Sequence, residues 1–374
     1  MKKIHLSVSN DLYTDQRVNR VSQTLHAMGF QVSLTGVMRP DSKAFNQPHA
    51  SIRRLRLLFQ SGFLFYAEYN LRLFFYLLTA KYQLLVANDL DTLLPNYLAA
   101  RIKGIPLIYD SHEYFTGSPE LRDRPIVKWF WKTLEKCLIT RQKHMITVND
   151  SIAALYEKEY GIKAVVVRNL PYFKKPVSRI PADELSLPPL KDFIILQGSG
   201  INMERGAEEL LLAMHPRYGL KHVVLLIIGS GDVLPALKKM AAEEQLHDSV
   251  LFFDRMTSEL LHEYTSHASI GISLDKGISL NYLYSLPNKL FDYIMAGTPQ
   301  LVSDLPEVSA IVSKYNTGMV ISSHEPADIA KAIADMLADK ERLKNWGENC
   351  LVAARDLCWE KEESRLKEIF RDFL

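Results

Sequence analysis

Short runs of apolar and β-branched residues alternate along the chain with longer segments whose apolar positions recur at helical spacing. This alternation is typical of parallel sheets covered by helices on both faces, because such strands are buried on both sides. In the first half of the chain, with helices between them, it predicts strands at Ile4–Val8, Gln31–Gly36, Leu84–Ala87, Leu107–Tyr109, Met145–Val148 and Ala164–Arg168. The pattern therefore indicates an α/β fold.

A proline-rich segment from Leu170 to Leu190 interrupts this rhythm, and proline removes backbone donors that helices and central strands need. Beyond it the alternation resumes, with strands expected at Phe193–Gln197, Val223–Ile228, Val250–Phe253, Ile270–Ser273 and Gln300–Ser303. We therefore predict two Rossmann-like domains, at residues 1–172 and 191–357, joined by a linker at 173–190. The amphipathic segment 358–374 is free to pack back on the first domain.

The composition agrees with two soluble domains, since 374 residues with 47% hydrophobic and 24% charged side chains can bury two cores. The most apolar stretch, Leu55–Ala80, is interrupted by Arg56, Glu68 and Arg72, so we expect no membrane-spanning helix. The first residues lack the long apolar core of a signal peptide. We therefore expect a cytoplasmic protein.

Charge and cysteine spacing argue against several other classes of protein. A formal net charge of +2 gives no general attraction to nucleic acid, so we expect no such partner. Cys137, Cys350 and Cys358 are far apart and lack metal-ligand spacing. The G-S-G turns at 198–200 and 229–231 lack the third glycine of a dinucleotide fingerprint. We expect neither a metal nor a nicotinamide cofactor.

The segment S-L-P-N-K-L-F-D-Y-I-M-A-G, residues 285–297, carries the most specific chemistry. Pro287 and Asn288 suit a helix start, whose free amide groups and dipole attract a phosphate. Lys289 adds a cation there, and Asp292 can accept hydrogen bonds from the vicinal hydroxyls of a ribose. The alternative is an ordinary amphipathic helix on which Lys289 and Asp292 form an exposed pair. The spacing alone does not choose between them.

This segment resembles the donor-binding signature P-x-K-x-x-E-Y-M-A-x-G-x-P of retaining glycosyltransferases of family GT4, also called group 1. The segment Gln197–Gly206 is similar to the loop after the first strand of their second domain. The resemblance implies a GT-B fold, in which two Rossmann-like domains face each other across a cleft and the second binds a nucleotide sugar. The donor-binding residues that it implies are Gly198, Gly200, Arg205, Gly229, Ser285, Leu286, Asn288, Lys289 and Asp292.

Two departures from the family pattern concern how the donor is held. The family usually places two cations in the first loop, and Arg205 matches the second, while Gly200 stands at the first. Asp292 occupies the usual position of a glutamate, and Tyr284 replaces the first acid of the family's E-x7-E pair. The identity of the sugar and the stereochemistry of transfer therefore stay open.

Acidic residues and a histidine follow two strands of the first predicted sheet. Asp110, His112 and Glu113 come directly after one of them, at the edge where open parallel sheets bind ligands. Such a histidine can hydrogen-bond a sugar hydroxyl or share in proton transfer; the alternative is a buried structural residue. Asp89 and Asp91 match the D-x-D of metal-dependent transferases. The resemblance implies cations and helix amides in place of a divalent metal, so we expect no metal and interpret Asp89 or Asp91 as a cap of the next helix.

The resemblance implies that a histidine in this loop reaches the transferred sugar, so His112 is the first catalytic candidate, together with Arg205 and Lys289. The loop after the first strand is usually glycine-rich in the family. Here a helix starting near Thr14 would carry Arg17 and Arg20 on one face, for a phosphate or for solvent. The candidates on the acceptor side are Asn10, Asp15, Arg17, Asp110 and Glu113.

The sequence as a whole leads us to expect transfer of a hexose-type sugar, with retention, from a nucleoside diphosphate to a glycan or lipid-linked acceptor. The resemblance implies bacterial polysaccharide biosynthesis, such as that of capsule or lipopolysaccharide. The basic and aromatic stretches Arg53–Tyr76 and Arg122–Lys132 suit peripheral contact with an anionic membrane, or core packing. Two alternatives are a GT-B sugar-nucleotide epimerase and a non-catalytic two-domain sugar-binding protein.

Overall fold

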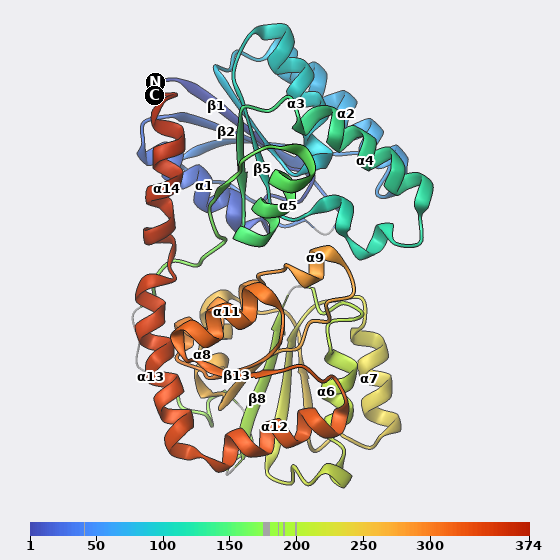
Figure 1. Cartoon of the computed structure of the whole chain (residues 1–374), viewed down its shortest axis with the longest axis vertical. Coiled ribbons are helices and arrows are strands. Elements are labelled where there is room, and N and C mark those ends of the chain that lie inside the picture. Colours follow the sequence, from blue (N-terminus) through green and yellow to red (C-terminus); the bar gives the residue numbers. More distant parts are fainter. Residues whose placement is uncertain (41, 175–179, 186, 190, 199) are drawn as a thin grey trace. The chain divides into compact units, whose positions relative to one another are not determined.

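The computed structural model describes residues 1–40, 42–174, 180–185, 187–189, 191–198 and 200–374. The chain forms two compact units: unit 1 is Met1–Asn169 with Lys361–Leu374, and unit 2 is Leu170–Glu360 (Figure 1). The expected linker 173–190 falls within unit 2, and its residues 175–179, 186 and 190 lie outside the described part of the chain.

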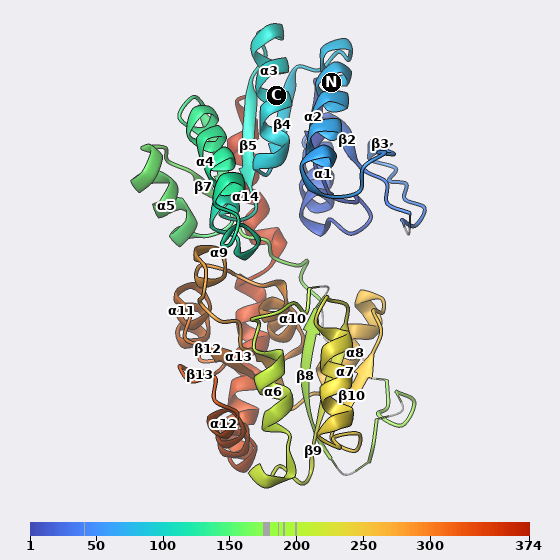
Figure 2. The same ribbon diagram turned by 90° about the vertical axis from the view of Figure 1, so that its right-hand side faces the viewer.

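Unit 1 is built around a parallel sheet with the strand order β3-β2-β1-β4-β5-β6-β7. Its strands are β1 (Lys3–Ser7), β2 (Gln31–Val37), β3 (Ala50–Leu55), β4 (Leu84–Asn88), β5 (Leu107–Ser111), β6 (His144–Thr147) and β7 (Val165–Val166). Its helices are α1 (Gln16–Ala27), α2 (Gly62–Thr79), α3 (Leu90–Lys103), α4 (Pro125–Ile139) and α5 (Asp150–Tyr160). Helices α2, α3 and α4 lie next to one another in the chain's fold (Figure 2).

Unit 2 repeats this architecture around a parallel sheet with the order β10-β9-β8-β11-β12-β13. Its strands are β8 (Asp192–Gly198), β9 (Val223–Gly229), β10 (Val250–Phe253), β11 (Ile270–Ser273), β12 (Gln300–Ser303) and β13 (Gly318–Ile321). Its helices are α6 (Ala207–Ala213), α7 (Leu234–Glu243), α8 (Ser258–His267), α9 (Leu280–Leu283), α10 (Asn288–Ala296), α11 (Pro306–Tyr315), α12 (Pro326–Ala338) and α13 (Lys340–Asp356). The α/β prediction is therefore confirmed.

The central strands of unit 2 show why the apolar runs predicted strands well. Ile194 of β8 packs in one core cluster with Leu225 of β9, while the next residue, Ile195, packs in a second cluster with Val224. Alternate side chains of a strand point to opposite faces of the sheet, so a strand covered on both faces must be apolar throughout.

Two strands were not predicted, one predicted strand is much shorter, and several other strand ends differ by one or two residues. The edge strand β3 was not predicted, because its sequence A-S-I-R-R-L is only half buried and lacks an apolar run. The short strand β13, at the edge of the other sheet, is likewise half buried and was also missed. The strand expected at Ala164–Arg168 is confined to Val165–Val166.

The last helix, α14 (Trp359–Arg371), supplies contacts to unit 1 from Lys361 onward. Glu362 accepts hydrogen bonds from the guanidinium and the backbone amide of Arg168, the amide at 2.9 Å. The rings of Phe370 and Phe30 meet edge to face, with 6.4 Å between their centroids. The amphipathic face of this helix is therefore buried on unit 1 beside the chain's first strands.

No helix in the described ranges is both long enough and apolar enough to cross a bilayer.

Candidate active site

The carboxyl edge of the unit 2 sheet is closely packed where the loops after β8, β9 and β11 meet. Gly229 has φ of +142°, and a Cβ atom there would lie 1.8 Å from the carbonyl oxygen of Gly198. Gly206 lies equally close to the loop after β11, because its Cβ would come within 2.2 Å of the carbonyl oxygen of Leu274. Glycine at these positions is thus required by close backbone approach.

The other predicted glycines of this edge are under no such constraint. A Cβ atom on Gly198 would have its nearest neighbour at 3.8 Å, and one on Gly200 at 3.7 Å. Gly200, which stands where the family has a cation, therefore has room for a side chain. Its neighbour Ser199 lies outside the described residues.

The structure brings together the two predicted cations, Arg205 and Lys289, through a carboxylate that the sequence did not predict. Asp275, in the loop after β11, has its Oδ1 3.1 Å from Nζ of Lys289. Its Oδ2 lies 3.5 Å from Nη1 of Arg205. Asp275 stands two residues after the end of β11, and Asp110 stands near the end of β5, so each is an acid at the carboxyl end of an apolar strand. This is the signal that would have identified Asp275.

Burial excludes one of the two interpretations of Lys289. Its side chain is 9% exposed and bonded to Asp275, so the alternative of an exposed Lys289–Asp292 pair is wrong. Burial lowers the pKa of the Lys289 ammonium, and the Asp275 carboxylate opposes that effect. The guanidinium of Arg205 also lies over the ring of Tyr282, 4.5 Å from its centroid.

Helix α10 begins at Asn288, as predicted, and ends at Gly297, whose φ of +71° suits glycine. Pro287 occupies the N-cap position and offers no side-chain acceptor, so the usual cap is missing. The hydroxyl of Ser285 is buried and has no hydrogen-bond partner in the described ranges. Leu286 packs against the core cluster beneath the helix. The start of α10 thus lacks a side-chain cap and lies beside an unused hydroxyl.

Asp292 lies one turn into α10, and its carboxylate reaches the end of the central strand β8. Its Oδ2 accepts a hydrogen bond from Nε2 of Gln197 at 3.3 Å. The other amide atom of Gln197 accepts a hydrogen bond from Thr265 at 2.6 Å, which fixes the orientation of the amide. Gln197 is a second residue of this edge that the sequence did not identify.

The carboxyl edge of the unit 1 sheet holds a group of charged residues around His112. Its Nδ1 lies 3.3 Å from Oδ2 of Asp89, and its Nε2 lies 3.5 Å from Oδ2 of Asp110. Asp110 is also held by Arg17, whose Nη2 and Nε donate to its two oxygens at 2.7 and 3.2 Å. The Nε2 atom of His112 is buried and makes no hydrogen bond within the described residues.

The protonation of this group follows from its burial and its charges. Burial alone would lower the pKa of His112, but the carboxylates of Asp89 and Asp110 outweigh burial and raise it to about 9. Burial raises the pKa of Asp89 to about 6. Burial also acts to raise the pKa of Asp110, yet Arg17 and His112 hold it well below its usual value. At neutral pH His112 is therefore an imidazolium, a donor and not a base.

Several expectations for this edge need correction. Arg17 and Arg20 do not form a solvated face, since they are 3% and 8% exposed. Arg17 bonds Asp110 and also donates to the carbonyl oxygen of Val167 at 2.7 Å. Asp89 does not cap α3 with its side chain: its φ is +62°, and its Oδ1 accepts the backbone amide of His112 at 2.8 Å.

The remaining acceptor-side candidates make different contacts from one another. Asp15 is the N-cap of α1, and its Oδ1 accepts the amide of Val18 at 3.0 Å. Asn10 is exposed, and its carbonyl oxygen accepts the amide of Val37 at 3.0 Å. Glu113 is half-buried beside His112. Two of the five candidates belong to the His112 group, since Asp110 lies 3.5 Å from His112 and Arg17 bonds Asp110.

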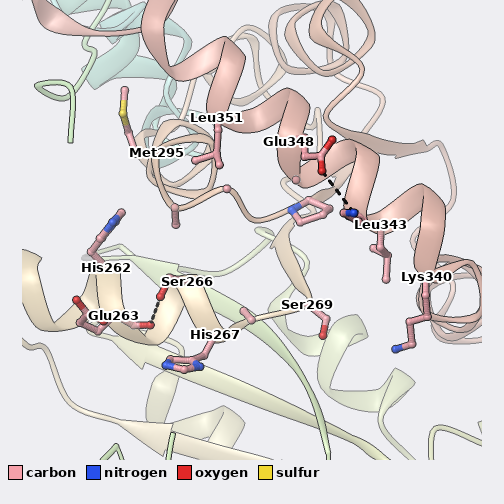
Figure 3. Close-up of a pocket in the computed structure, with 16 residues that line it drawn as sticks. His262, Glu263, Ser266, His267, Ser269, Met295, Lys340, Leu343, Glu348 and Leu351 are labelled. Carbon is pink, nitrogen blue, oxygen red and sulfur yellow. Dashed lines mark hydrogen bonds and ion pairs between the residues drawn. The ribbon is translucent and has the colours of Figure 1, made fainter. Parts of the chain in front are cut away.

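A separate cavity of about 440 Å³ in unit 2 lies away from these residues (Figure 3). It is lined by α8, the end of α10 and the first half of α13, and Ser269 and Pro299 place it at the amino ends of β11 and β12. The predicted donor residues lie at the opposite ends of these strands. This cavity is therefore not a candidate active site.

Comparison with known families matches each unit separately. Residues 15–170 match the model of the family described as Glycosyltransferase Family 4, and residues 182–351 match that of Glycosyl transferases group 1. A D-inositol 3-phosphate glycosyltransferase of Nocardia farcinica is 28% identical over 38% of this chain and 30% of its own length. An alpha-D-kanosaminyltransferase of Streptomyces kanamyceticus is 23% identical over 68% of this chain and 67% of its own.

Solved structures extend the likeness in fold to the full length. Sucrose-phosphate synthase of Thermosynechococcus elongatus has a TM-score of 0.80 at 18% identity, covering 100% of this chain and 99% of that one. WaaG, a glycosyltransferase involved in lipopolysaccharide biosynthesis, has 0.74 at 14% identity, covering 98% and 99%. Anabaena HepE in complex with UDP-glucose has 0.73 at 13% identity, covering 100% of both chains. With both units matched, the chain belongs to the GT4, or group 1, glycosyltransferases of the GT-B fold.

Proposed function

We propose that the protein transfers a hexose-type sugar, with retention, from a nucleoside diphosphate to a glycan or lipid-linked acceptor. The observation that carries this proposal is the position of Arg205 and Lys289, joined by Asp275 beside the uncapped start of α10. Two cations and a helix N-terminus at one sheet edge are what a diphosphate requires. Relatives of the same fold include one bound to UDP-glucose, which supports a nucleotide-sugar donor.

In this mechanism the donor's diphosphate replaces the Asp275 carboxylate as the partner of Lys289 and Arg205. Both cations then stabilise the negative charge that builds on the leaving diphosphate as the glycosidic bond breaks. The buried hydroxyl of Ser285 donates to the same phosphates. Asp292, whose carboxylate lies at the end of β8, accepts hydrogen bonds from the ribose hydroxyls. These side chains supply the charge stabilisation, so the proposal includes no metal.

His112 acts in unit 1 as a hydrogen-bond donor to a sugar hydroxyl. Its raised pKa keeps both ring nitrogens protonated at neutral pH. Nε2 lies 3.5 Å from Oδ2 of Asp110 and makes no hydrogen bond of normal geometry in the described part of the chain. Arg17 and Asp89 balance and orient it, which makes them positioning residues. This role replaces the proton-transfer alternative.

The biological setting is also part of the proposal. The structural relative WaaG acts in lipopolysaccharide biosynthesis, which supports a bacterial glycan or lipid-linked acceptor for this chain. We place the enzyme in the cytoplasm, where nucleotide sugars are available to it, with contact to the inner face of the membrane.

Calorimetry and turnover of two variants test the proposal. Asp292→Ala should weaken binding of the preferred nucleoside diphosphate roughly tenfold or more, since it removes a charged partner of the ribose. His112→Ala should keep that affinity and lower turnover, followed as nucleotide release. Unchanged affinity in Asp292→Ala would contradict the assignment of the donor site to α10. Full turnover in His112→Ala would contradict the catalytic role of His112.

The acceptor requirement separates transfer from epimerisation on the same fold. Nucleotide release that needs an added glycan or lipid-linked acceptor supports a transferase. Release at the same rate without any acceptor supports the epimerase alternative.

A further inference from the structure

The outer surface of unit 1 exposes large apolar side chains at the starts of two helices. They are Phe63 and Leu64 in the first turn of α2, and Ile126, Trp129 and Phe130 in the first two turns of α4. Ile126, Phe63 and Trp129 are 80%, 72% and 68% exposed. The rings of Phe63 and Phe130 meet with 6.5 Å between their centroids. These five residues therefore form one surface, which we call the aromatic patch.

Core packing does not account for the aromatic patch, because other residues of the same helices serve the core. Helix α2 buries Phe65, Tyr69, Leu73 and Leu77 on its inner face, and α4 buries Trp131 and Leu138. Both helices therefore carry apolar residues on the face toward solvent as well as on the buried face, although polar residues are usual on the solvent face. A contiguous exposed apolar surface of this kind marks an interaction site.

The charges beside the aromatic patch indicate its partner. Within residues 122–136 the cations are Arg122, Arg124, Lys128, Lys132 and Lys136, against the acids Asp123 and Glu135. Glu135 faces inward, fully buried, and accepts hydrogen bonds from Thr116 and Tyr160. Arg124 and Lys128 are exposed next to the apolar side chains. The chain's formal net charge is only +2, so this positive rim is a local feature.

We propose that the aromatic patch docks unit 1 on the surface of an anionic lipid bilayer. Trp129, Ile126 and Phe63 enter the boundary between headgroups and acyl chains, while Arg124 and Lys128 contact lipid phosphates. Trp and Phe flanked by Lys and Arg is the composition suited to that boundary. A second copy of the chain fits less well, because self-association would bring the two positive rims together.

The patch is connected to the His112 loop of the same unit. Phe115, three residues beyond His112, packs on Trp131 with 4.9 Å between the ring centroids, and Thr116 donates to Glu135 at 2.8 Å. Both α2 and α4 precede parallel strands, so they begin near the carboxyl edge of the sheet, where His112 lies. Docking there brings a lipid-linked acceptor to this edge. This consequence for the acceptor rests on the proposed function, whereas the docking itself does not.

Vesicle co-sedimentation tests the docking with the full-length protein. Wild type should bind vesicles of phosphatidylcholine and phosphatidylglycerol and should be released by added salt, while binding to phosphatidylcholine alone stays weak. A triple variant, Phe63→Ser, Ile126→Ser and Trp129→Ser, should bind the anionic vesicles at least roughly tenfold less well. In a double variant, Arg124→Gln and Lys128→Gln, the affinity for the anionic vesicles should fall about fivefold for each charge removed.

Matched controls separate docking from misfolding and from the donor site. Ile102→Ser removes an apolar side chain that is 65% exposed, at the end of α3, and should bind vesicles like wild type. The triple variant should keep the wild-type melting temperature and affinity for nucleoside diphosphate. If neither wild type nor the variants bind a nucleoside diphosphate while wild type still binds vesicles, the proposed function is contradicted and the docking proposal is not.

Two outcomes overturn the docking proposal. One is equal binding of wild type and the triple variant to the anionic vesicles, or no binding by either. The other is a wild-type dimer in sedimentation velocity that the triple variant converts to a monomer, without vesicle binding by wild type. That second result would assign the patch to an interface between copies of the chain.

Discussion

At the scale of single residues, Asp275 determines how the two donor-side cations are held before a donor arrives. It is almost fully buried and lies 3.1 Å from Lys289 and 3.5 Å from Arg205. The carboxylate compensates the charge of the buried Lys289 and also neutralises part of the charge of Arg205, which is 27% exposed. In the proposed mechanism the same carboxylate competes with an incoming diphosphate.

Asp275→Asn is therefore expected to have opposite effects on stability and on binding. Removing one partner of a buried ion pair typically costs about 3–5 kcal/mol, so the melting temperature without ligand should fall. The nucleoside diphosphate should bind more tightly, because it no longer displaces a carboxylate. Thermal unfolding and calorimetry measure the two effects.

A nearby ion pair gives the control for this variant. Glu209→Gln breaks the contact of Glu209 with Lys276, 2.5 Å long in the same region, without touching either donor-side cation. It should leave the diphosphate affinity unchanged. If Asp275→Asn binds the diphosphate more weakly than wild type, Asp275 contacts the donor directly and is not a competitor.

The charge on His112 is a second property set by single residues. Because its folded pKa of about 9 lies above the ordinary 6.5, the charged ring contributes stability below pH 6.5, lost as the pH rises through 9. In Asp89→Asn the neighbouring carboxylate is gone and burial weighs more, so the His112 pKa should fall. NMR titration of the ring protons measures both values. A wild-type His112 that titrates at or below 6.5 would contradict this account.

At the scale of elements, the approach of β8 and β9 at their carboxyl ends fixes where the donor-side loops begin. Gly229→Ala places a Cβ atom against the Gly198 carbonyl group, at a φ that alanine rarely adopts. We expect a loss of several kcal/mol, on the order of the largest single-site effects. Gly200→Ala, in open space, is the control and should unfold like wild type. Equal denaturation midpoints for both variants would refute the close approach.

The sequence predicted the central strands and the edge strand β10, and it missed the edge strands β3 and β13. Central strands such as β8 must be apolar on both faces, so each appears in the sequence as a short continuous apolar run. The edge strand β3 needs only one partner and carries two arginines, so no local pattern identifies it. The start and end of α10 were readable from Pro287 and Gly297 because proline and glycine act locally.

The candidate site was predictable to the same extent. Lys289 and Asp292 were identified by their spacing together with the family resemblance, but the bond between Lys289 and Asp275 joins two different elements. Gln197, Asp275 and Asp292 come together only through the packing of β8, β11 and α10. Such contacts depend on strand register and side-chain direction, which no local pattern encodes. The exposed face of α4 likewise required the fold, since Trp129 and Trp131 differ only in which side they face.

At the scale of the whole molecule, each unit contributes a distinct chemical group to the proposed reaction. Unit 2 supplies cations and a helix start for a diphosphate, and unit 1 supplies an imidazolium and a surface for lipid. The two family matches divide at the same place in the chain, with residues 15–170 on one side and 182–351 on the other. The whole-chain proposal therefore predicts that affinity for the nucleoside diphosphate depends on unit 2 alone.

Calorimetric titration of the intact protein with nucleoside diphosphates and monophosphates tests this central claim most directly. Wild type should bind one nucleoside diphosphate at least roughly tenfold more tightly than its monophosphate, a difference of about 1.4 kcal/mol from the second phosphate. Arg205→Gln should abolish that preference, and His112→Ala should preserve it. Equal affinity of wild type for diphosphate and monophosphate, or an Arg205→Gln variant that keeps the preference, would contradict the assignment of the donor site.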